Sequence, residues 1–514
     1  MENSKIKKHQ LISHTNGKSL EEINGTVKVP KNASFFKTLL AYSGPGALVS
    51  VGYMDPGNWS TSITGGQNFQ YLLISVILMS SLIAMLLQYM AAKFGIVSQM
   101  DLAQAIRART SKSLGIVLWI LTELAIMATD VAEVIGAAVA LYLLFKIPLI
   151  LAVFITVFDV FLLLLLTKIG FRKIEALVVC LILVILGIFV YQVALSNPDW
   201  RAIMEGFIPT AKTISTSPTV AGMTPLSGAL GIIGATVMPH NLYLHSSISQ
   251  SRQIDHQDGK EVARAVRFST WDSNIQLSVA FVVNALLLIM GVAVFKTGVI
   301  KDPSFFGLFD ALSTPSVLSN SILADVAKTG ALSVLFAVAL LASGQNSTIT
   351  GTLTGQIIME GFVHMRMPLW ARRLLTRLIS VIPVLVCVSL TKNLSLVDQH
   401  VAINSLMNDS QVFLAFALPF SVLPLLILSS SKQEMGEFKN SRLIAFLGWF
   451  SAVALTVLNI IGLPDQIKIL FPKNLLWAAD GISGLLIILM LGLLIWTIFD
   501  LRRSSKALRQ SRQS

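Results

Sequence analysis

Long apolar runs constrain the fold of this sequence more than any other feature. Residues 71–90 and 149–166 are two of these runs. A stretch of about 18 or more apolar residues is long enough to cross the hydrocarbon core of a bilayer as a helix, so such runs predict transmembrane helices. Charged residues make up only 13% of the chain, whereas a soluble domain carries roughly 25%. The sequence therefore predicts an all-α integral membrane protein.

About twelve spans can be placed along the chain, with polar tails at both ends. Residues 1–37 predict a disordered cytoplasmic tail without a cleavable signal peptide, and residues 501–514 predict a second cytoplasmic tail, also disordered. The predicted spans are residues 39–66, 69–95, 114–145, 148–167, 174–196, 226–249, 271–295, 330–355, 374–391, 403–429, 442–463 and 475–499.

Lysine and arginine residues collect in the connections on one side of the predicted spans. With the N-terminus in the cytoplasm, 30 of the 39 Lys and Arg residues fall in cytoplasmic segments. This excess follows the positive-inside rule, so we expect a multi-pass plasma-membrane protein with both termini cytoplasmic. The longer loops 197–225 and 296–329 then face outward. The net charge of +12 reflects this topology and does not indicate nucleic-acid binding, and Cys180 and Cys387 lie in apolar runs that predict no disulfide.

Two predicted spans are interrupted by polar tetrads. Residues 55–58 (Asp-Pro-Gly-Asn) interrupt the first span and residues 238–241 (Met-Pro-His-Asn) interrupt the sixth. Breaks five spans apart predict an inverted repeat, about 38–196 and 226–430, with a binding site at the breaks. Residues 440–500 supply two extra spans outside a transport core of 38–430. Proline alone commonly kinks membrane helices, and the polar groups at both breaks are what favour a site.

The prolines leave backbone acceptors without partners. Proline has no N–H, so Pro56 and Pro239 deprive the carbonyls of Gly52 and Ala235 of their helical hydrogen bonds. An unsatisfied carbonyl in the membrane interior costs several kcal/mol. A cation bound between the two breaks would stabilise both carbonyl oxygens.

Side chains at the breaks favour a transition metal. Asp55 offers a carboxylate, Asn58 an amide oxygen and Met238 a thioether. Sulfur adds little for Mg²⁺ or Ca²⁺ but suits Mn²⁺, Fe²⁺, Co²⁺ or Cd²⁺. The alternative for Met238 is gap-filling core packing. Gln411, within the tenth span, either reaches the ion or makes a helix–helix hydrogen bond.

The third span carries three acids, Glu123, Asp130 and Glu133. Their spacings of seven and three place them on one helical face. Three acids on one face of a membrane helix predict a proton path or a solvated cavity. We expect Arg377 to pair with Glu133, or else to anchor the helix at the cytoplasmic surface.

Other charged residues leave more alternatives. Arg372 and Arg373 are expected to be surface anchors. His240 and His245, the two histidines within spans, are candidates for a proton relay, structural hydrogen bonds or metal ligation. No role can be assigned to three further intramembrane acids. They are Asp159, Asp409 and Asp480.

The motifs together resemble those of a known family. Residues 55–58 and 238–241 resemble the two signature motifs of the natural resistance-associated macrophage protein (Nramp) family. Residues 344–362 and 373–377 resemble that family's end of span eight and start of span nine. The similarity covers nearly the whole membrane portion. Length and span count look like those of its bacterial manganese/proton symporters.

The resemblance implies a LeuT-type repeat, alternating access and proton-coupled import of Mn²⁺ or Fe²⁺. Magnesium-carrying relatives lack the methionine, which favours manganese or iron here. The metal ligands that it implies are Asp55, Asn58, Met238 and the Ala235 carbonyl, joined in some states by the Gly52 carbonyl and Gln411. The residues that it implies for proton movement are Asp130, Glu133 and His240, with Arg377 in a salt bridge.

Other functions are alternatives to proton-coupled metal import. The same fold can host a sodium-coupled amino-acid transporter, but an Asp and a Met at the breaks suit an anionic substrate badly. A passive cation channel fits two broken helices less well than rocking around a central site does. No nucleophile–base pair, phosphate loop or zinc cluster indicates an enzyme. We expect no cofactor beyond the transported metal and protons, and no obligate protein partner.

Overall fold

The structure, a computed structural model, describes residues 23–30, 33–159, 171–195, 198–295, 302, 304–314, 321–365, 367–469, 471 and 473–513. Within these residues, nine helical stretches are long and apolar enough to cross a membrane. The predicted first and sixth spans are divided, and residues 160–167 of the fourth lie outside the described part. The all-α membrane fold is confirmed, whereas the number twelve stays a prediction.

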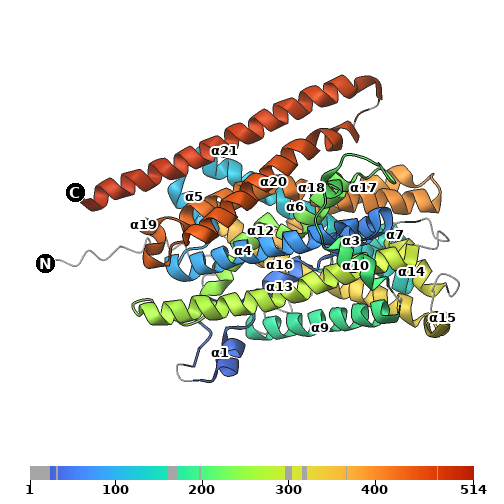
Figure 1. The fold of residues 1–514 in the computed structure, drawn as a ribbon, viewed down its shortest axis with the longest axis horizontal. Helices are drawn as coiled ribbons and strands as arrows, with labels where there is room; N and C mark the ends of the chain where they lie inside the picture. Colours follow the sequence, from blue (N-terminus) through green and yellow to red (C-terminus); the bar gives the residue numbers. More distant parts are fainter. Residues whose placement is uncertain are drawn as a thin grey trace.

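The long helices run roughly along one axis of the molecule (Figure 1). They are α4 (Ile74–Ser98), α6 (Lys112–Phe145), α9 (Phe171–Leu195), α13 (Gly259–Phe295), α16 (Ala331–Val363), α17 (Leu369–Thr391), α18 (Leu396–Ser429), α20 (Arg442–Ile469) and α21 (Leu476–Gln513). The short helix α7 spans Leu149–Thr156, and the 3-10 turns are η2 (Gln70–Leu73), η3 (Ala211–Ile214), η4 (Ser249–Ser251), η6 (Gly436–Phe438) and η7 (Lys473–Leu475).

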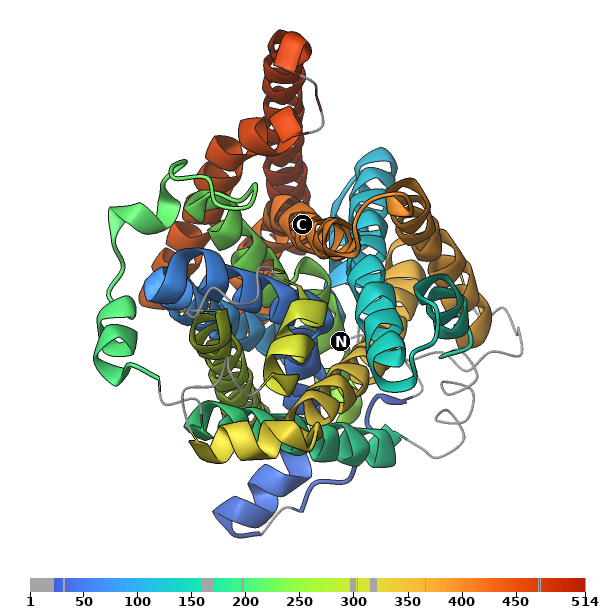
Figure 2. The ribbon, with the colours of Figure 1, turned by 90° about the vertical axis from the view of Figure 1, so that its right-hand side faces the viewer.

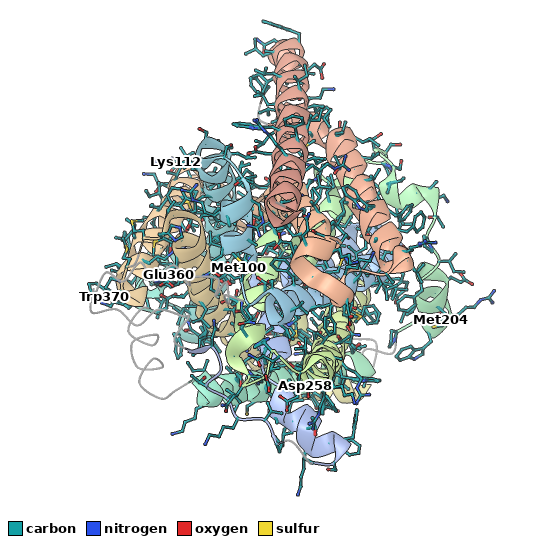
Figure 3. All side chains as sticks on the ribbon, turned by 90° about the vertical axis from the view of Figure 1, so that its left-hand side faces the viewer. Met100, Lys112, Met204, Asp258, Glu360 and Trp370 are labelled. Atoms are coloured by element: carbon teal, nitrogen blue, oxygen red, sulfur yellow. The ribbon has the colours of Figure 1, made fainter. Side chains whose placement is uncertain are left out.

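Short helices mark the two ends of the bundle. One end carries α1 (Phe35–Tyr42), α5 (Leu102–Arg109) and α19 (Lys432–Met435). Figure 3 looks onto this end, where Met100, Lys112 and Asp258 are labelled. The opposite end, which faces the viewer in Figure 2, carries α10 (Trp200–Gly206), α14 (Phe305–Ser313) and α15 (Ser321–Lys328). The connections predicted for the two sides of the membrane are thus segregated.

Two helix pairs are divided at the predicted tetrads. The first pair is α2 (Pro45–Gly52) and α3 (Pro56–Phe69), and the second is α11 (Pro225–Val237) and α12 (Pro239–Ile248). Asp55 caps α3, because its carboxylate accepts from the Asn58 backbone N–H at 2.8 Å. Met238 has φ +28°, a left-handed value rare for a residue with a side chain. Local sequence therefore sets both breaks.

Glycines let neighbouring helices approach these breaks. A Cβ on Gly136 of α6 would overlap the Pro56 ring, and one on Gly234 of α11 would overlap the Gln411 backbone in α18. Neither position tolerates a side chain without a shift of its neighbour. As a result, α6 and α18 lie directly against the divided helices.

Helices extend into both predicted tails where the structure describes them. Helix α1 begins at Phe35, and α21 continues past Asp500 to Gln513. Residues 501–513 lack glycine and proline and are rich in Arg, Lys, Ala, Leu and Gln, which favour helix. Residues 1–22 and 31–32 lie outside the described residues. Helices α20 and α21 lie together along one side of the bundle (Figure 1).

Candidate metal centre

One side-chain amide joins the oxygens of the two divided helices. The Nδ2 of Asn58 donates to the Asp55 Oδ1 at 2.7 Å and to the Gly52 carbonyl at 3.0 Å. It also donates to the Ala235 carbonyl of α11 at 2.8 Å. All four residues are buried. The structure thus brings three predicted ligand oxygens around one position.

This position has more acceptors than donors. An amide nitrogen carries two N–H groups, yet three oxygens surround that of Asn58. The second carboxylate oxygen of Asp55 has no hydrogen-bond partner among the described residues. The Asn58 Oδ1 has only long contacts of 3.4 Å, from Thr236 and Asn284. Rotating the amide by a half turn would direct four oxygens at one point, an arrangement that a cation stabilises.

We call the oxygens of Asp55, Gly52 and Ala235 around the Asn58 amide the cluster. Met238 is separated from it by the Asn241 side chain. The Asn241 Nδ2 lies 3.6 Å from the Met238 sulfur and 3.4 Å from the Val49 carbonyl of α2. A Cβ on Gly52 would overlap the same Asn241 amide. The thioether is fully buried and is linked through Asn241 to the end of α2.

Gln411 lies against the first break from the α18 side. A Cβ on Gly57 would overlap its side-chain amide. Its Oε1 is buried and has no partner within the described ranges, whereas its Nε2 donates to the Ser410 hydroxyl at 3.0 Å. The helix–helix hydrogen bond weighed as an alternative is not formed there, and the amide oxygen is available to a ligand.

A cavity of about 150 Å³ adjoins the cluster. Thr61, Gly231 and Asn408 line it, and each lies three or four residues from Asn58, Ala235 or Gln411, about one helical turn. At its other side the cavity is lined by residues 221–223, in the connection that follows α10. It therefore lies between the cluster and the α10 end of the bundle.

The acids of α6 face arginines of α17. Arg372 contacts Glu123 at 2.7 Å, and Arg373 contacts Asp130 at 2.5 Å and Glu133 at 2.8 Å. The predicted shared face of the three acids is confirmed. The prediction that Arg372 and Arg373 are surface anchors is wrong, since their side chains are only 5% and 1% exposed. Buried carboxylates require such partners.

Asp159 completes this ion-pair network. The predicted contact of Arg377 with Glu133 is present at 3.4 Å, but Arg377 lies closer to Asp159. Arg373 also reaches Asp159 at 3.3 Å. The buried carboxylates of Asp130, Glu133 and Asp159 thus share two guanidinium groups, those of Arg373 and Arg377. One negative charge is in excess, which a proton can neutralise.

Two serines of α16, which the sequence reasoning missed, link the network to the first break. The Ser343 hydroxyl donates to the Met54 carbonyl at 2.6 Å, and the Ser347 hydroxyl donates to Glu133 at 2.5 Å. Their spacing of four residues, which places them on one helical face, was the available signal. The two serines thus lie between Met54, which precedes Asp55, and the acids of α6. We call this pair of hydroxyl groups the Ser343–Ser347 line.

The two histidines have different surroundings. His245 Nδ1 lies 3.0 Å from the Gln88 Oε1, and the Gln88 amide donates to the Tyr53 hydroxyl at 2.8 Å. His245 thus makes the structural hydrogen bond that was one of its alternatives. His240 is buried, and its Nδ1 has no partner in the described part of the chain.

Comparisons with known proteins identify the family of this chain. Residues 46–465 match the family model of natural resistance-associated macrophage protein-like proteins. The divalent metal cation transporter MntH of Levilactobacillus brevis is 54% identical over 455 residues, 88% of this chain and 94% of the relative. MntH of Pediococcus pentosaceus is 55% identical over 87% of this chain and 97% of the relative.

Solved structures show the same relationship. The Eremococcus coleocola manganese transporter, in complex with an aromatic bis-isothiourea substituted compound, is 66% identical with a TM-score of 0.89. The match covers 95% of this chain and 99% of that one. Mhp1 in its inward-facing conformation, at 12% identity and a TM-score of 0.51 over 96% and 95% of the two chains, shares the fold alone. The chain belongs to the natural resistance-associated macrophage protein (Nramp) family of membrane transporters.

Proposed function

We propose that this chain imports divalent transition-metal cations, Mn²⁺ or Fe²⁺, together with protons, by alternating access. The observation that carries the proposal is the convergence of the Asp55, Gly52 and Ala235 oxygens on one buried position. The MntH relatives and the Eremococcus protein, named for divalent metal cations and manganese, support the same substrate class.

Metal binding at this position requires a change at Asn58. The amide rotates, so that its oxygen replaces its nitrogen among the Asp55 and backbone oxygens. Gln411 supplies a further oxygen, and the Met238 sulfur exchanges its contact with Asn241 for the ion. A mixed oxygen and sulfur site favours Mn²⁺, Fe²⁺ or Cd²⁺ over Ca²⁺ and Mg²⁺.

The proton part rests on the excess carboxylate of the ion-pair network. A divalent cation adds two positive charges beside a single carboxylate, Asp55. Asp55 gives up its proton when the cation binds, and its O–H bond breaks as the carboxylate forms. Ser343 and Ser347 lie between the neighbouring Met54 carbonyl and Glu133 and mark the route of this proton towards Glu133 and Asp130. Arg377 keeps the acids within one network. The other proposed members of the path are His240, His245 and Glu123.

The proposed orientation places both termini in the cytoplasm and the protein in the plasma membrane. The excess of Lys and Arg in the connections at one end of the bundle supports it. The cavity next to Thr61 then lies on the outer side of the oxygen cluster, the side from which an imported cation arrives.

Reconstitution into liposomes tests the proposal. Uptake of Mn²⁺, Ca²⁺ and amino acids is measured with a pH dye inside the vesicles, and protein-free vesicles serve as the control. We expect Mn²⁺ uptake with internal acidification. Mn²⁺ uptake without acidification would refute proton coupling, and amino-acid uptake without metal uptake would refute the substrate class.

A further inference from the structure

Asp409 is an intramembrane acid for which neither the cluster nor the ion-pair network provides a role. It lies in α18 and lines the cavity of about 150 Å³ next to the cluster. The rest of the lining is uncharged, with hydroxyl and amide groups that include Thr64, Asn404 and Gln466. Asp409 is therefore the ionisable residue of this cavity in the part of the chain that the structure describes.

The neighbouring polar groups satisfy one another. The Ser60 hydroxyl lies 2.8 Å from both the Asn404 and Asn408 amide oxygens, and the Asn404 nitrogen donates to Thr64 at 3.1 Å. The Asp409 carboxylate, by contrast, has no ion pair or hydrogen bond to any described residue. The Asp409 side chain is exposed, and a carboxylate at membrane depth is expensive unless it faces water or a cation.

Two different spaces adjoin Asp409, and their linings indicate which of them can accommodate its charge. Asp409, Val412 and Gln466 line both this cavity and an apolar groove between α18, α20 and α21. The groove is otherwise lined by side chains such as Phe416 and Leu489 and cannot solvate a charge. The hydroxyl and amide groups of the cavity can, and the cavity lies one helical turn from the metal cluster.

We propose that Asp409 is a capture site for the hydrated divalent cation, which it holds in the cavity before the ion loses water and reaches Asp55. The inference rests on the proposed function and adds a second cation site on the same route. A single exposed carboxylate acts mainly by raising the local cation concentration, and salt screens that effect. Asp409 thus determines the KM for the metal, whereas the oxygen cluster around Asp55 determines the maximal rate.

The test compares initial rates of Mn²⁺ uptake into liposomes for the wild type, Asp409→Asn, Asp409→Glu and Asp480→Asn. Asp480 is a matched control, because Lys468 pairs with it at 2.9 Å and it does not line the cavity. For Asp409→Asn we expect KM to rise roughly threefold to tenfold, at the lower end of electrostatic focusing because one charge is removed. The maximal rate stays within about twofold of the wild type, and Asp409→Glu and Asp480→Asn keep the wild-type KM.

Ionic strength separates capture from a structural role. The KM difference between Asp409→Asn and the wild type should shrink as the ionic strength rises from about 10 mM to about 300 mM, because the Debye length falls from roughly 30 Å to below 8 Å. An unchanged KM, a lower maximal rate at unchanged KM, or a salt-independent difference would overturn the inference. A wild-type protein that transports no Mn²⁺ would instead refute the proposed function.

Discussion

The substitution Asn58→Ala removes the amide shared by three buried oxygens, so it should destabilise the metal-free protein. Those oxygens, of Asp55, Gly52 and Ala235, lie 2.7 to 3.0 Å from it. The Asp55 Oδ1 keeps the hydrogen bond from the Asn58 backbone N–H, so the Gly52 and Ala235 carbonyls are the acceptors that lose their donor. A buried acceptor that loses its donor costs about 1–3 kcal/mol, which gives roughly 2–6 kcal/mol for two. We expect a loss of about 4 kcal/mol in the free energy of unfolding, the middle of this range.

The same substitution should reduce the gain in the free energy of unfolding that Mn²⁺ produces. A ligand at 100 times its Kd stabilises a protein by about 2.7 kcal/mol. The wild type should show a gain of this order with Mn²⁺, and Asn58→Ala a smaller one at the same concentration, because it lacks one ligand oxygen. Asn459→Ala is the matched control. The Asn459 amide donates to a single acceptor, the Ala415 carbonyl, at 2.7 Å.

The assay is thermal unfolding of the detergent-solubilised protein, first with chelator and then with excess Mn²⁺. Asn459→Ala should lose about 1–3 kcal/mol and keep the full metal response. The reasoning fails if Asn58→Ala melts no lower than Asn459→Ala in chelator. It fails equally if Asn58→Ala gains as much from Mn²⁺ as the wild type.

Four further substitutions test three separate parts of the account. Met238→Ala should increase Ca²⁺ uptake and weaken competition by Cd²⁺, and unchanged selectivity would contradict the thioether role. Ser347→Ala should retain Mn²⁺ uptake but lower the number of protons moved per metal, because Glu133 loses a 2.5 Å hydrogen bond; a constant ratio measured with the internal pH dye would exclude that route. Arg373→Gln should lower the free energy of unfolding by about 3–5 kcal/mol, whereas Arg372→Gln should cost less, because its acidic partner Glu123 is 18% exposed and stays partly solvated. Equal losses in chemical denaturation would contradict this difference.

The oxygen cluster at the two helix breaks, the candidate metal site, could be predicted in large part because its chemistry is local. Pro56 and Pro239 divide their helices wherever they stand, and the freed acceptors follow from the missing N–H groups. Sequence reasoning did not show that the Asn58 amide bridges to Ala235, 177 residues away. That contact depends on how α3 packs against α11, and no local pattern encodes it.

The ion-pair network was predicted less completely. The periodicity of α6 placed Glu123, Asp130 and Glu133 on one face, since that property belongs to a single helix. Which arginine meets which acid depends on the rotation and depth of α17 against α6, so Arg373 was misjudged. Asp159 comes from a separate span, and nothing near it in the sequence marks it as a partner.

The central claim is that the transported metal binds between the two helix breaks. Anomalous diffraction at the manganese absorption edge, from crystals grown with Mn²⁺, tests it most directly. The account predicts a peak within about 2.5 Å of Asp55, Asn58 and the Ala235 carbonyl, with Met238 turned towards it, and no such peak in Asp55→Ala. A peak among the acids of α6, or an unchanged peak in Asp55→Ala, would contradict the account.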